Sequence, residues 1–268
     1  MIYAAFIMWF FLLIFIGIGV YHIAARLIGG RAVSWILLPG TLISEMAWIL
    51  GALVTGGEVR KARLIQADGG SAEGTESQGG LKIGPLVSAL LAIVACATAV
   101  VLLDRWLGQS VLWAFSVDLA ILPREVLPQA LPGSWDAFWQ IVSDQPILMK
   151  RICETFGELT WSEWQTPVFI YLSVCLAVRL APARRNLRAT LGAVVVLSIL
   201  IGLTGLVWKD FADSIQNLWR LLTYLYALVL TLLGAMLLAW AAVSLVRVFT
   251  GKSGRRRRHR ASHPEPAE

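Results

Sequence analysis

Six long apolar runs constrain what this chain can fold into more than any other feature. A helix rises about 1.5 Å per residue, so about 20 apolar residues cross the roughly 30 Å hydrocarbon core of a bilayer. Of the 268 residues, 57% are hydrophobic and only 15% are charged, whereas soluble domains carry about 25% charged residues. This composition excludes a disordered chain and a coiled coil, and it predicts an all-α polytopic membrane protein. The six expected transmembrane helices are 2–20, 33–54, 85–103, 161–180, 190–208 and 221–246, within a membrane domain covering 1–250.

The distribution of basic residues predicts the orientation of these spans. Six crossings place both chain ends on one side, and that side receives the denser set of Lys and Arg. By the positive-inside rule, both termini are expected to be cytoplasmic, in a multi-pass protein of the cell inner (plasma) membrane. The run 2–20 is too long for a signal-peptide core and has no preceding basic residues, which favours an uncleaved first helix.

The basic tail at 251–268 carries much of the net charge of +6. Seven of the 23 Lys and Arg lie from Arg247 onward. Because this run directly follows an apolar span, we interpret it as a disordered cytoplasmic tail that fixes topology and contacts anionic lipid, in preference to nucleic acid. The three cysteines, two of them inside apolar runs, do not form a disulfide framework.

Two connections between spans are long. The segment 66–84 is rich in Gly, Ser and Glu and is expected to be a flexible loop. The segment 104–160 is rich in Trp, a residue that prefers the head-group layer of a membrane.

Apolar periodicity within 104–160 predicts two helices. One apolar face begins after a plausible N-cap, Ser134, and its helix is expected to end at Pro146. These helices either lie in the membrane interface, where they shape an entrance or a docking surface, or simply pack on the ends of the spans. The first face comprises Trp135, Phe138, Trp139 and Val142, and the second comprises Leu148, Ile152, Phe156 and Leu159.

Glu45 is the one acidic residue well inside an apolar run, which makes it a functional candidate because a carboxylate there costs a few kcal/mol. Its surroundings resemble the membrane-embedded zinc metalloproteases related to site-2 proteases. Relatives of that kind show Pro-Gly, then His-Glu-x-x-His on a helix, then a Thr-Gly-Gly-like turn into a short strand. The matching residues here are Pro39, Gly40, Glu45, Thr55, Gly56, Gly57 and Val59.

The zinc ligands that this resemblance implies are missing. Ser44 and Trp48 occupy the two histidine positions, where a hydroxyl is a poor zinc ligand and an indole has no lone pair to donate. A second likeness spans Tyr171 to Arg188, where Asn186 stands in place of an aspartate that the resemblance implies as a metal position. The resemblance therefore implies the scaffold of a protease, a pseudoenzyme with Glu45 as a relic of the general base, and no cofactor.

The leading hypothesis is a non-catalytic protein that binds a membrane-protein client or has a regulatory role. One alternative is an active metalloprotease that holds zinc through non-standard ligands, for which His22 and Asn186 are the only further donors. Another is a small transporter or channel. For Glu45 itself we favour a carboxyl that is neutral or paired with a neighbour, such as Ser44, Thr41, His22 or an arginine from another span. Arg179 is expected to snorkel to the cytoplasmic interface.

Overall fold

The apolar runs fold into helices because hydrocarbon offers no water to satisfy backbone polar groups, so each segment must bond internally. The computed structural model describes residues 2–56, 58–63, 71–75, 84–120, 127–180, 187–208 and 211–249. The expected loop 66–84 lies mostly outside this part of the chain, and the basic tail 251–268 lies outside it entirely. The described elements are α1 (Ile2–Leu27), α2 (Gly30–Ile36), α3 (Leu38–Val54), β1 (Glu58–Arg63), β2 (Ser71–Thr75), α4 (Gly84–Leu103), the π-helix η1 (Asp104–Gly108), α5 (Gln109–Ala120), α6 (Trp135–Glu158), α7 (Gln165–Arg179), α8 (Leu187–Val207) and α9 (Phe211–Phe249).

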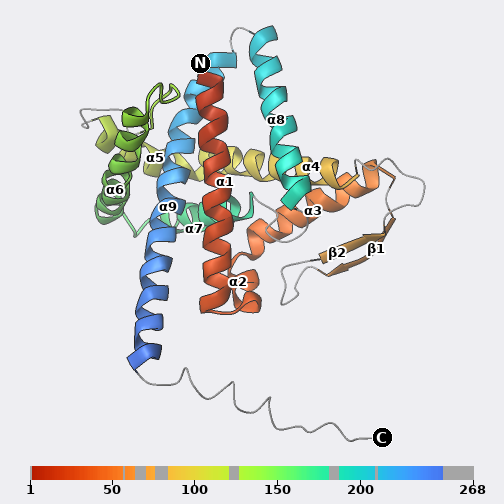
Figure 1. Ribbon diagram of the computed structural model, residues 1–268, viewed down its shortest axis with the longest axis horizontal. Helices are drawn as coiled ribbons and strands as arrows, with labels where there is room; N and C mark the ends of the chain where they lie inside the picture. The colour runs from red at the N-terminus through yellow and green to blue at the C-terminus, as the bar shows by residue number, and fades with distance from the viewer. Residues whose placement is uncertain are drawn as a thin grey trace, which may run out of the picture.

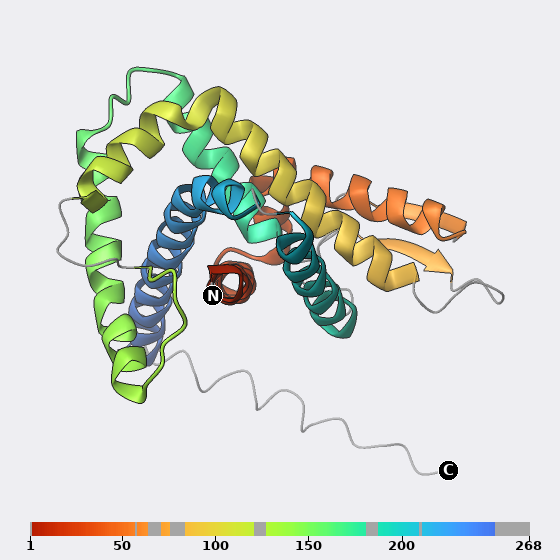
Figure 2. The same ribbon diagram turned by 90° about the horizontal axis from the view of Figure 1, so that it is seen from above.

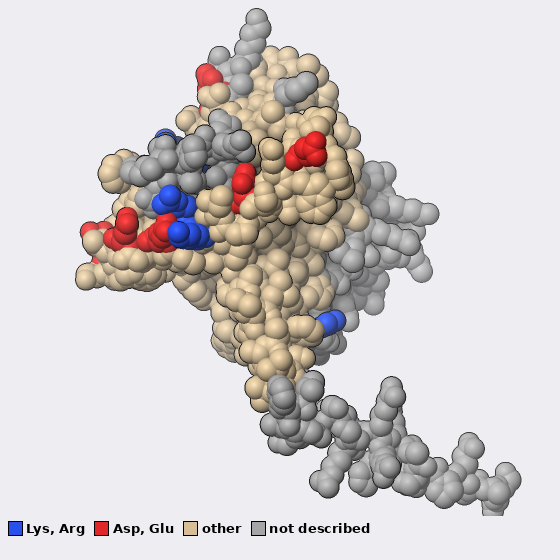
Figure 3. All heavy atoms as spheres, turned by 60° about the vertical axis from the view of Figure 1, so that its left-hand side comes forward, with Lys and Arg blue, Asp and Glu red and all other residues tan. Residues whose placement is uncertain are grey.

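The helices run in two main directions. Helices α1, α8 and α9 are upright in Figure 1, and α1 packs against α9. Helices α3 and α4 pack side by side and run across the direction of α1, which is seen almost end-on in Figure 2. Strands β1 and β2 form an antiparallel hairpin, with Glu58 paired to Thr75 and Arg63 paired to Ser71. Most of the described surface on the face shown in Figure 3 carries no Lys, Arg, Asp or Glu.

Long apolar helices make the structure compatible with a membrane-embedded protein, but six crossings are not confirmed. Within the described residues, four helical stretches are long and apolar enough to cross a bilayer, or five if α2 and α3 count as one bent span. The expected span 161–180 is shorter in the structure, because α7 has 15 residues and reaches only about 22 Å. The expected span 85–103 is α4, which continues through η1 and α5 into the Trp-rich segment. The four stretches are Ile2–Leu27, Gly84–Ser116, Ala189–Val207 and Asp213–Val246.

A sharp break separates α2 from α3, which meet at 88°. Pro39 lies in the first turn of α3, where its missing N–H removes no helical hydrogen bond, so the new helix starts immediately before it. The break leaves the carbonyl of Ile36 without a helical donor. The Tyr171 hydroxyl of α7 donates to this carbonyl over 2.7 Å, and the Cys175 thiol donates to it over 3.5 Å. Helix α7 therefore satisfies the backbone group that the break exposes.

Replacing Tyr171 with phenylalanine should destabilise the fold by about 1 kcal/mol, the usual net contribution of one hydrogen bond. The same substitution at Tyr224 is a matched control, because the Tyr224 hydroxyl is buried and has no hydrogen-bond partner among the described residues. Tyr224→Phe should leave stability unchanged or raise it. Denaturant unfolding of the detergent-solubilised chain measures both variants, and equal losses from the two would disprove the role given to Tyr171.

Helix α6 corrects one expectation from the sequence. It is a single helix that runs through Pro146 to Glu158, so the predicted end at Pro146 is wrong. The expected N-cap is confirmed, since the Ser134 hydroxyl oxygen accepts a hydrogen bond from the Ala137 backbone N–H at 3.2 Å. A proline interior to a helix removes one backbone bond, and burial of Leu148 and Ile152 in the second half of α6 holds the helix against the core across this point.

Candidate functional site

Helix α3 positions Glu45 between a buried face and an exposed face. The buried face consists of small residues three or four positions apart, which lets neighbouring helices approach closely. The exposed face is a stripe of large apolar side chains, and Glu45 itself is half-buried at its margin. The buried residues are Gly40, Thr41, Ser44, Ala47 and Gly51, and the exposed ones include Leu42, Met46, Leu50 and Leu53.

Two glycines on this helix show how closely its neighbours pack. A Cβ atom added at Gly40 would overlap the backbone carbonyl of Cys175 in α7. One added at Gly51 would lie 2.5 Å from the Cα atom of Ser88 in α4. Backbone atoms cannot move aside as flexible side chains do, so α3 is fixed against both helices at these two points.

Arg179, the last residue of α7, is a buried basic residue that packs beside α3. Its side chain is only 6% exposed, so the expectation that it snorkels to an interface is wrong. The guanidinium carbon lies 4.9 Å from the centre of the Tyr21 ring, in cation–π geometry. Its aliphatic stem packs beside Gly40.

Glu45 lies within electrostatic range of the Arg179 guanidinium. Two nitrogens of that guanidinium, Nε and Nη2, have no hydrogen-bond partner in the described part of the chain. A buried cation is costly unless opposite charge or an aromatic face compensates it, and here Glu45 and Tyr21 supply both. The site is thus a junction of α1, α3 and α7 centred on one arginine.

The residues at the two histidine positions do not fit a zinc ion. Ser44 is 6% exposed and belongs to the packing face of α3, and Trp48 is partly buried against the hydrophobic core. Neither side chain has the donor that zinc requires. Over the residues that the structure describes, no three His, Cys, Asp or Glu side chains gather as a metal site would need.

The two further donors considered for zinc do not complete a ligand set. His22 is exposed, and its Nδ1 lies 2.9 Å from the carbonyl oxygen of Ile18, one turn earlier in α1. Asn186 lies outside the described residues. Among the described residues, the arrangement around Glu45 therefore offers charge compensation from Arg179 and no set of metal ligands.

The sequence pointed to Glu45 and to an arginine from another span as one candidate neighbour, but it did not identify Arg179 or Tyr21. The available signal was the presence of two opposite charges within separate apolar runs, because such charges commonly pair inside a membrane. An arginine near a helix end is ambiguous from sequence, since its long stem allows either burial or snorkelling.

The first half of α6 presents an exposed aromatic surface. Trp135 is 69% exposed and Trp139 is 53% exposed. The Trp135 ring stacks on Phe138, and the Trp139 ring meets both of them edge to face. Exposed Trp rings of this kind are typical of the membrane interface, where the ring is half buried and its N–H stays hydrated.

The fold and this site define a predominantly helical protein with several helices long and apolar enough for a membrane. Comparison of the chain with protein-family models, with curated proteins and with solved structures finds no match.

Proposed function

We propose that this chain is an integral membrane protein built on a metalloprotease-like scaffold, and that it binds a membrane-protein client without cleaving it. In this proposal the protein lies in the inner (plasma) membrane with both termini cytoplasmic. Four crossings, the number of single helices of sufficient length in the described residues, would keep both termini on one side.

The observation that carries the proposal is the buried guanidinium of Arg179 within electrostatic range of Glu45. A zinc protease places a divalent cation beside its glutamate, where the ion activates water. Arginine stays protonated in proteins, so Arg179 supplies a permanent positive charge to Glu45 and opposes the binding of a second cation nearby. Because Arg179 opposes a second cation and neither Ser44 nor Trp48 can ligate zinc, we assign Glu45 a structural or binding role.

The exposed stripe on α3 supports binding as that task. Leu42 and Met46 are 45% and 60% exposed, and both lie within a turn of Glu45 along the helix. A client helix packed on this stripe would bury apolar surface and could place a polar side chain beside the half-buried carboxyl. Hydrogen bonds between membrane helices contribute about 0.6 to 2 kcal/mol each.

The purified full-length protein should contain well below one zinc ion per chain, measured by elemental mass spectrometry after purification without chelators. The Glu45→Gln variant should give the same value, since Glu45 holds no metal in this proposal. One zinc ion per wild-type chain would contradict the proposal whether or not Glu45→Gln retains it, because the glutamate of His-Glu-x-x-His is a general base and not a zinc ligand. Cleavage of a membrane protein that depends on Glu45 would contradict it equally.

Photo-cross-linking in native membranes tests client binding, with a photo-reactive residue placed at position 46 instead of Met46. A matched position is Leu206 on α8, which is 83% exposed and far along the chain from Glu45. The Met46 position should cross-link to a small set of membrane proteins that the Leu206 position does not reach. Identical cross-linked products from both positions would show that α3 has no specific client, which would contradict the proposal.

A further inference from the structure

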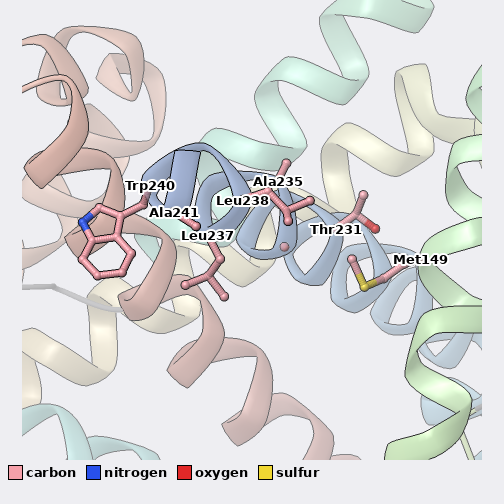
Figure 4. Close-up of a pocket in the computed structure, with 8 residues that line it drawn as sticks. Met149, Thr231, Ala235, Leu237, Leu238, Trp240 and Ala241 are labelled. Atoms are coloured by element: carbon pink, nitrogen blue, oxygen red, sulfur yellow. The ribbon is translucent and has the colours of Figure 1, made fainter. Parts of the chain in front are cut away.

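We draw no further inference here: the strongest candidate, the apolar groove between Met149 of α6 and one face of α9 (Figure 4), carries none, because the Met149 methyl group already occupies the space over Gly234 and nothing in the described residues shows what covers the rest of that face.

Discussion

Replacing Arg179 with methionine should lower the free energy of unfolding by about 2 kcal/mol, the scale of a cation–π contact that is shielded from water. The guanidinium is 6% exposed, lies over the Tyr21 ring and is within electrostatic range of Glu45. Methionine keeps the aliphatic volume beside Gly40, so the loss reports charge and cation–π interactions rather than a cavity. Unfolding in detergent by denaturant or heat provides the measurement.

A double-mutant cycle separates the contribution of Glu45 from that of Tyr21. Glu45→Gln alone should destabilise the protein by leaving the Arg179 charge with less compensation. The double variant, Glu45→Gln with Arg179→Met, should be destabilised by less than the sum of the two single variants, because neither charge is then left without its partner. Arg26→Met provides the matched control, since Arg26 is exposed at the end of α1 and its loss should cost little. Additive single-variant effects would show that Glu45 and Arg179 do not interact.

Gly40→Ala should prevent stable folding or cost more than about 3 kcal/mol, although the change adds a single methyl group. That methyl would overlap the backbone carbonyl of Cys175, and only separation of α3 from α7 would relieve the overlap. Separation would also stretch the hydrogen bond from Tyr171 to Ile36 at the nearby break. Yield of monodisperse protein and its unfolding temperature measure the effect.

The same substitution at Gly202 controls for the intrinsic preferences of glycine and alanine. Gly202 lies in α8 with nothing within 4 Å of the added atom, so Gly202→Ala should stabilise its helix by up to about 1 kcal/mol. The two identical substitutions are therefore expected to have opposite signs. A Gly40→Ala protein as stable as wild type would show that α3 and α7 are not in contact as described.

The sequence predicted the helices better than it predicted their arrangement. The apolar runs that begin at Ile2 and Pro85 are predicted to be helices, because the length of an apolar run can be counted in the sequence. Helices α1 and α4 cover these two runs. The expected span 33–54 is instead divided near Leu37, where α2 ends and α3 begins. Hydropathy carries no information on the angle between two helices, so it could not show that α4 runs across the direction of α1.

Packing decided the points at which the sequence was misleading. Pro146 disfavours a helix locally, but the burial of Leu148 and Ile152 outweighs one lost hydrogen bond. Arg179 is compatible with either an interface or a core, and only the proximity of Tyr21 and Gly40 places it inside. The sequence showed that Ser44 and Trp48 cannot donate to zinc, whereas it could not show which arginine lies near Glu45.

The bend before Pro39 and the close packing of Gly40 against α7 determine what a Pro-Gly dipeptide in this chain indicates. Both residues are demanded by backbone architecture alone: one starts a helix after a corner, and the other admits a neighbouring carbonyl. The dipeptide therefore reports the geometry of this helix corner, and by itself it carries no information on catalysis.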